Sequence, residues 1–125
     1  MNILIVDDNK DDVALARRLL ERNGHTVSHA GTGPAALEML AGDPLPDLLL
    51  LDVMLPQIDG FAVLRRLRAE ERTRHLPIIM LSGFDRHQDV ARGKALGADD
   101  YIVKPLMEYH FLGRIARFAN RKPAS

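Results

Sequence analysis

The chain alternates short, wholly apolar segments with longer segments whose apolar residues recur at helical spacing. Runs of three to five apolar residues are too short for helices and are typical of strands covered on both faces, as in a parallel sheet. Four such runs are Ile3 to Val6, Leu48 to Leu51, Pro77 to Leu81 and Tyr101 to Val103. A fifth segment, His25 to Ala30, carries polar Thr26 and Ser28, which favours a half-exposed strand at a sheet edge.

Helices are expected between these strands, and most of them begin or end at a recognisable residue. Asn9 precedes fourteen residues with helical apolar spacing, which Gly24 ends. Proline is tolerated in a first helical turn, so Gly33-Pro34 opens the next helix. The others are expected from Asp59-Gly60 to about Glu71, from Asp85 to Leu96 before Gly97, and through Phe111 to Phe118. Five strands alternating with five helices predict an α/β fold with a parallel sheet covered on both sides.

Composition indicates one cytoplasmic globular domain. A chain of 125 residues is long enough to bury a core without cross-links. It contains no cysteine, which excludes disulfides and cysteine zinc sites and suits a reducing compartment. The first residues do not have the layout of a signal peptide, and no apolar run approaches membrane-spanning length. We therefore expect a cytoplasmic location and no membrane contact.

The net charge of zero conceals two halves of opposite sign. Residues 1–60 contain 4 basic and 10 acidic residues, a charge of −6, and residues 61–125 contain 13 and 7, a charge of +6. Alternating solvated helix faces account for most of this pattern. A second interpretation is an acidic partner near the last helix, attracted by Arg114, Arg117, Arg121 and Lys122. There is no concentrated basic patch with interleaved aromatic residues, so direct nucleic-acid binding is not expected.

Polar side chains follow each of the four apolar strands at the point where the strand ends. Asp7 and Asp8 follow the first run, and Asp52, Ser82 and Lys104 follow the others. Because ligands of open α/β sheets bind outside the carboxyl ends of the strands, we expect these groups to form one site. Taken singly, the acids are explained as helix caps, Ser82 as a turn residue and Lys104 as a solvated surface lysine.

The chemistry of these side chains favours phosphoryl transfer to a carboxylate. Two carboxylates about 4 Å apart repel by about 4 kcal/mol at an effective dielectric near 20, so one stays protonated or a cation lies among them. An all-oxygen site suits Mg²⁺, which attracts phosphoryl oxygens. Lys104 and Ser82 can bind those oxygens, and Asp52 can act as the nucleophile that forms an aspartyl phosphate.

The combination resembles the receiver domain of two-component response regulators, of the chemotaxis-regulator type. The segments that carry the resemblance are Asp7-Asp8, Asp52 with Met-Leu-Pro-x-x-Asp-Gly behind it, Ser82-Gly83 and Tyr101-Ile-Val-Lys-Pro105. It covers almost the whole chain and implies a flavodoxin-like, doubly wound sheet of five parallel strands in the order 2-1-3-4-5 with five helices. We assign residues 1–120 to this domain and 121–125 to a tail or the start of a linker.

The resemblance also implies a role for each matching residue. Asp52 would accept a phosphoryl group from a phosphohistidine of a sensor kinase or phosphotransfer protein. Mg²⁺, with Mn²⁺ as a substitute, would be held by Asp7, Asp8, Asp52 and the backbone carbonyl of Met54. Ser82 and Lys104 would contact the phosphoryl oxygens, Tyr101 would turn inward with Ser82 as the switch, and the Lys104–Pro105 peptide would be cis.

The same resemblance predicts how the domain would act on others. A population shift of the fourth helix, fifth strand and fifth helix would control a downstream protein or output domain. The protein would be a monomer or a weak homodimer, and it would catalyse its own phosphorylation and dephosphorylation without being an enzyme for another substrate. Met54 and Phe84 are bulky and apolar at positions that influence water attack, which predicts slow loss of the phosphoryl group.

Two other functions remain as alternatives. A Mg²⁺-dependent phosphohydrolase of the haloacid-dehalogenase type also uses an aspartate nucleophile, but it usually carries a second Asp two residues on, where this chain has Met54. A flavodoxin-type FMN protein would need a Ser/Thr/Gly-rich phosphate loop after the first strand. The acids from Asp7 to Asp12 would repel a phosphate there.

Overall fold

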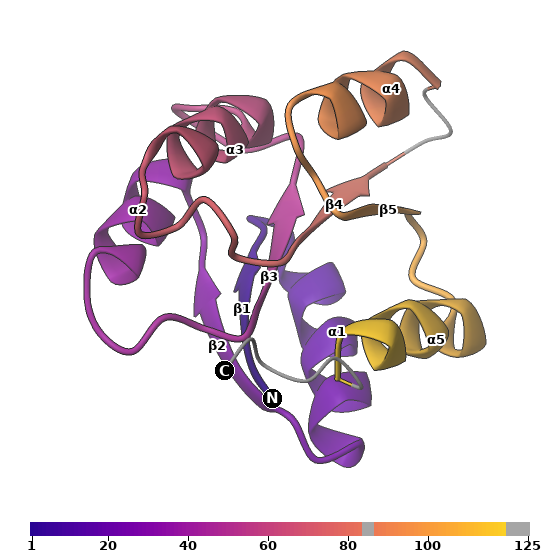
Figure 1. Cartoon of the computed structure of the whole chain (residues 1–125). Coiled ribbons are helices and arrows are strands. Elements are labelled where there is room, and N and C mark those ends of the chain that lie inside the picture. The colour runs from indigo at the N-terminus through magenta and orange to yellow at the C-terminus, as the bar shows by residue number, and fades with distance from the viewer. Residues whose placement is uncertain (84–86, 120–125) are drawn as a thin grey trace.

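A computed structural model describes residues 1–83 and 87–119 as one parallel sheet with helices on both faces (Figure 1). The strands are β1 (Asn2–Val6), β2 (Thr26–Ala30), β3 (Leu48–Asp52), β4 (Ile78–Ser82) and β5 (Asp100–Val103). The helices are α1 (Lys10–Arg22), α2 (Gly33–Leu40), α3 (Gly60–Ala69), α4 (His87–Ala95) and α5 (Glu108–Ala119). The strand order is β2-β1-β3-β4-β5, and every pairing is parallel. The predicted fold and strand order are confirmed, with the half-polar second strand at an edge.

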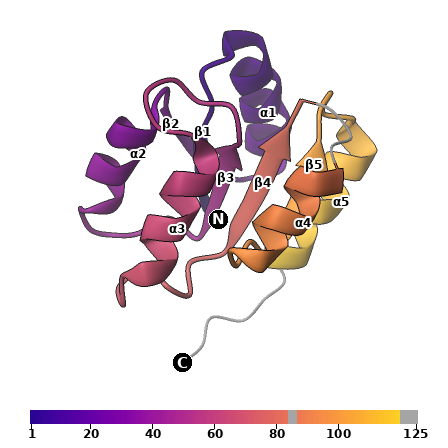
Figure 2. The same cartoon turned by 90° about the horizontal axis from the view of Figure 1, so that it is seen from above.

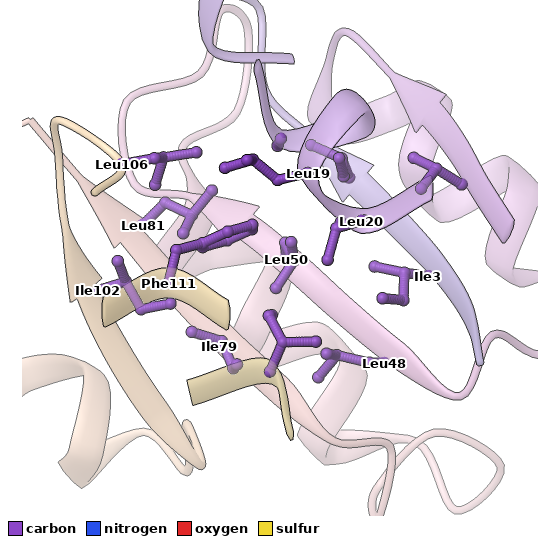
Figure 3. Packing of buried hydrophobic residues seen from close by; sticks show 14 of the residues in the cluster. Ile3, Leu19, Leu20, Leu48, Leu50, Ile79, Leu81, Ile102, Leu106 and Phe111 are labelled. Carbon is purple, nitrogen blue, oxygen red and sulfur yellow. The ribbon is translucent and has the colours of Figure 1, made fainter. Parts of the chain in front are cut away.

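The central strands are apolar throughout because each of their faces is covered by helices. Alternate residues of a strand point to opposite faces, and both faces of β3 are fully buried. Helices α1 and α5 cover one face, and α2, α3 and α4 cover the other (Figure 2). Phe111 of α5 lies over the centre of the first face, among Leu50, Leu81 and Ile102 (Figure 3). This double coverage fixes the position of β3 and of the carboxylate at its end.

Helix boundaries agree with the sequence signals at most ends. The side chains of Asn9, Thr32 and Asp59 each accept a hydrogen bond from a first-turn backbone N–H, as N-caps do. Gly24 and Gly97 follow helices α1 and α4 with φ of +85° and +102°, the left-handed conformation that glycine adopts without strain.

The third helix is shorter than predicted. It ends at Ala69 and does not reach Glu71, because Glu70 already has an extended backbone (φ −94°, ψ 132°). The guanidinium of Arg68 donates to the carbonyls of Thr73, Arg74 and Leu76 in the turn that follows the helix. The predicted cap at Asp85 and the predicted tail, residues 121–125, lie outside the described residues.

None of the helices in the described part of the chain has the length and apolar character needed to cross a membrane.

A side chain at Gly60 is expected to destabilise the fold, whereas a side chain at Gly113 is not. A Cβ added at Gly60 would lie 2.1 Å from the backbone oxygen of Asp52, so either α3 or the end of β3 would have to move. We predict that Gly60→Ala lowers the free energy of unfolding by about 3 kcal/mol. Gly113 lies on the exposed side of α5 with nothing within 4 Å, so Gly113→Ala should raise it by about 0.5–1 kcal/mol. Urea unfolding of both variants measures the contrast, and equal effects would contradict it.

Candidate functional site

The carboxyl ends of β1, β3, β4 and β5 meet at one edge of the sheet, and the predicted site residues lie there. Asp52 and Ser82 are the last residues of β3 and β4, while Asp7 and Lys104 directly follow β1 and β5. The register aligns Asp52 with Leu81 and Ser82 with Val103, so the strand ends are level. The backbone N–H of Lys104 donates to the carbonyl of Ser82 over 2.6 Å, which ties the last two strands together.

Asp7 and Asp8 begin the turn that leads from β1 into α1. The Asp7 side chain is buried, and its Oδ1 accepts a hydrogen bond of 2.9 Å from the backbone N–H of Asn9. Asp8 is exposed at the same edge. One carboxylate is thus fixed inside the protein, and its neighbour faces solvent.

Asp52 is buried, with only 4% of its surface exposed. Its Oδ1 accepts a hydrogen bond of 3.0 Å from the backbone N–H of Met54. The Gly60 N–H donates to the carbonyl of Val53 over 2.9 Å, so the start of α3 is bound to the first residue after β3. The bond from Met54 fixes the orientation of the Asp52 carboxylate.

The Lys104 ammonium lies among three carboxylates. Its Nζ is 2.7 Å from Asp7 Oδ2, 2.9 Å from Asp52 Oδ2 and 2.9 Å from Asp12 Oδ2. The ammonium donates hydrogen bonds to Asp7 and Asp52, and Asp12 is its third ion-pair partner. Because Lys104 is itself largely buried, these ion pairs lie where water screens them least.

Burial raises the pKa of Asp52 to about 6, and the neighbouring Asp7 adds to the rise while Lys104 opposes it. Burial alone would lower the pKa of Lys104, but its hydrogen bonds to Asp7, Asp52 and Asp12 outweigh burial and hold that pKa above its ordinary value. Lys104 therefore stays charged, and the acids remain in excess over it.

The arrangement of the acids fits a hard divalent cation. Asp7, Asp8 and Asp52 each offer an oxygen within 4.8 Å of the others. Oxygen ligands with room for water are what Mg²⁺ and Mn²⁺ prefer. A single lysine leaves negative charge uncompensated among these acids, so a cation would remove repulsion.

Ser82 and Tyr101, the predicted switch pair, are both buried; Ser82 ends β4, and Tyr101 is the second residue of β5. A methyl group added at Gly93 of α4 would lie 3.5 Å from two ring carbons of Tyr101, so the ring packs beneath that helix. The Lys104–Pro105 peptide is cis, as expected. Phe84, which was expected to shield the site together with Met54, lies outside the described residues; the Met54 side chain is 65% exposed.

Two contacts of the site were not predicted. Asp12 was named only among the acids after the first strand that would repel a phosphate, and its ion pair with Lys104 depends on where α1 packs. His29 Nε2 donates to the backbone carbonyl of Asp7 over 2.8 Å from the neighbouring strand β2. The only sequence signal for His29 was its place near the end of the edge strand, and that does not identify a partner.

Comparison with known proteins places these features in one family. The model of the response regulator receiver domain matches residues 3–116. The response regulator PleD of Caulobacter vibrioides is 41% identical over 113 residues, which are 90% of this chain and 25% of PleD. The chain spans between a quarter and about half of the curated relatives it matches.

Solved structures agree with the sequence relatives. A putative response regulator from Chloroflexus aurantiacus has a TM-score of 0.91 at 33% identity, covering 96% of this chain and 98% of that one. The Mn²⁺-bound form of response regulator Rcp1 has a TM-score of 0.79 at 27% identity, covering 91% and 88%.

Asp52→Asn is expected to stabilise the metal-free protein at neutral pH. In the folded protein the pKa of Asp52 is about 6, above the ordinary 3.8. Between these two pH values the folded protein keeps a proton on Asp52 that the unfolded chain has lost. The free energy of unfolding of the wild type therefore falls as pH rises from about 4 to about 6. Near pH 7.5 Asp52 is ionised, and the whole of this loss of stability remains. Allowing for solvent screening at the open edge, removing the charge should add about 1–2 kcal/mol near pH 7.5.

Urea unfolding in a chelator, near pH 7.5 and near pH 4.5, measures this difference. At the lower pH the folded wild type is already protonated at Asp52, so the advantage of Asn should shrink. An advantage of the same size at both pH values would contradict the charge explanation.

Proposed function

The chain belongs to the response regulator receiver domain family, whose members are signalling domains, and from this premise we propose that it is a phosphoacceptor switch with Asp52 as the acceptor. One observation carries the proposal: a buried carboxylate at the end of β3 lies 2.9 Å from a lysine ammonium and beside two further acids. The phosphodonor we propose is a phosphohistidine of a sensor kinase or of a phosphotransfer protein. The domain we propose comprises residues 1–120.

The positions of the side chains support the roles that we propose for them. An Asp52 carboxylate oxygen attacks the donor phosphorus, forming a P–O bond, while the P–N bond breaks and the imidazole nitrogen recovers the electron pair. The Lys104 ammonium neutralises charge on the transferred phosphoryl oxygens, and the Ser82 hydroxyl donates to another of them. Both groups stand on strand ends, so they need little reorganisation during the transfer.

A divalent cation is part of the proposal. Asp7, Asp8, Asp52 and the Met54 carbonyl would hold Mg²⁺, or Mn²⁺ in its place, and the bound ion would supply positive charge to the phosphoryl oxygens. The distances among the three carboxylates support this assignment. A related response regulator, Rcp1, has a Mn²⁺-bound form, which supports a divalent cation in a similar fold.

The output of the switch would pass through α4, β5 and α5. Ser82 would move toward the phosphoryl group, and Tyr101 would follow it, changing how α4 lies on β5. The buried ring of Tyr101 against Gly93 of α4 supports a mechanical link between these elements. The partner would be a downstream protein or output domain, with the domain itself a monomer or weak homodimer.

Phosphorylation of the purified chain is the direct test. Incubation with a small phosphodonor and Mg²⁺ should add one phosphoryl group to the intact mass, and hydroxylamine should remove it, because an acyl phosphate is labile to that nucleophile. Asp52→Asn should abolish the gain. Asp59→Asn is the control, because the Asp59 carboxylate caps α3 and is not one of the proposed site residues.

The other outcomes are equally specific. Release of inorganic phosphate in many turnovers without an accumulating adduct would indicate the phosphohydrolase in place of the switch. A mass gain that survives Asp52→Asn would overturn the assignment of the acceptor.

Met54→Asn is expected to shorten the lifetime of the phosphoryl group. Met54 lies two residues after Asp52 and is 65% exposed, so a small polar residue at this position would admit and orient water. We expect the hydrolysis rate to rise by about three- to tenfold, a barrier change of about 1 kcal/mol. The decay of the intact-mass adduct after donor removal measures it, for the single variant and for Met54→Asn with Phe84→Ala. Unchanged decay in both would contradict the prediction.

A further inference from the structure

Asp12 is a carboxylate of the site for which the proposed function has no role, and we propose that it is a positioning residue for Lys104. In this proposal Asp12 retains the lysine at the sheet edge while a divalent cation binds Asp7 and Asp52. The inference rests on the proposed function, because it assumes that a cation binds there. Asp12 would keep a charged partner beside Lys104 when the cation binds the other acids.

The geometry creates a competition. The two oxygens that Lys104 binds on the buried acids, Asp7 Oδ2 and Asp52 Oδ2, belong to carboxylates that would also hold the cation. A dication brought close to the ammonium repels it and draws on the same oxygens. At least one of these two ion pairs must therefore weaken when the cation binds.

Asp12 stands outside this competition. In the described part of the chain, Asp7, Asp8 and Asp52 form the group of acids whose oxygens all lie within 4.8 Å of one another, and Asp12 does not belong to that group. Its Oδ2 is nevertheless 2.9 Å from Lys104 Nζ. It belongs to α1, where its backbone N–H donates to the Asn9 side chain, so the position of its backbone does not depend on the strand ends that would hold the cation.

A displaced Lys104 therefore keeps one charged partner and does not become a buried, unpaired cation, which is strongly unfavourable. Removing the Asp12 carboxylate should make cation binding weaker, because the ammonium would then have to give up its last partners. The lysine would also be less well placed for the phosphoryl oxygens.

The test compares two neighbouring acids by Mn²⁺ binding, measured from the electron paramagnetic resonance of the free ion. Asp11 lies on the same helical turn, is exposed, and is not an ion-pair partner of Lys104. Asp11→Asn and Asp12→Asn remove the same charge. We expect Asp12→Asn to raise the Kd by about tenfold and Asp11→Asn by no more than about threefold. Asp12→Glu, which keeps a carboxylate, should remain within about threefold of wild type.

Lys104→Met completes a double-mutant cycle. In that background Asp12→Asn should weaken Mn²⁺ binding no more than Asp11→Asn does, since there is no ammonium left to position. Circular dichroism establishes whether Lys104→Met is folded; should it not fold, the comparison of Asp11→Asn with Asp12→Asn decides alone.

Three results separate the hypotheses. Equal weakening by the two Asn variants would overturn the role of Asp12 and reduce it to a general charge effect. A tenfold loss that persists without Lys104 would also overturn it. Failure of the wild-type chain to bind Mn²⁺ in the absence of Mg²⁺ would overturn the cation site itself, and with it the proposed function.

Discussion

The ion pairs of one lysine with three aspartates hold the site of this protein together. Lys104 joins the end of β5 to the ends of β1 and β3 and to the first turn of α1. Without its charge, buried Asp7 and Asp52 would face each other across low-dielectric protein, and one would have to be protonated. Burial is the main cause of the raised pKa of Asp52, Asp7 adds to it, and the single ammonium offsets the rise only in part. This imbalance is what makes the edge receptive to a divalent cation.

The rest of the fold serves to place that cluster. Strand β3 is buried on both faces, so helices pack against it from either side and its final carboxylate has little freedom. Gly60 lets α3 begin against the backbone of Asp52 with no room for a side chain. Tyr101, on the strand that leads to this edge, packs against α4 at Gly93. In the proposed switch, a change at Asp52 would reach α4 by this contact.

Sequence reasoning reached the strands and the main site residues because their signals are local. Short apolar runs such as Leu48 to Leu51 have no polar residue to suggest an exposed face, and the polar residue that ends each run marks the ligand-binding edge. It overestimated α3, because the hydrogen bonds of Arg68 to the carbonyls of Thr73, Arg74 and Leu76 come from a turn that periodicity does not describe.

The amino-acid sequence was enough to predict the fold class, the strand order implied by the family resemblance, and the acids and the lysine at the strand ends. These depend on side-chain polarity and spacing, which the chain displays directly. The set of acids that share Lys104 became visible in the folded chain, where Asp12 lies beside the lysine and His29 binds the backbone carbonyl of Asp7. Those contacts join segments far apart in the sequence, so they depend on the packing of α1 and β2 beside β1, and that packing is settled by the whole core.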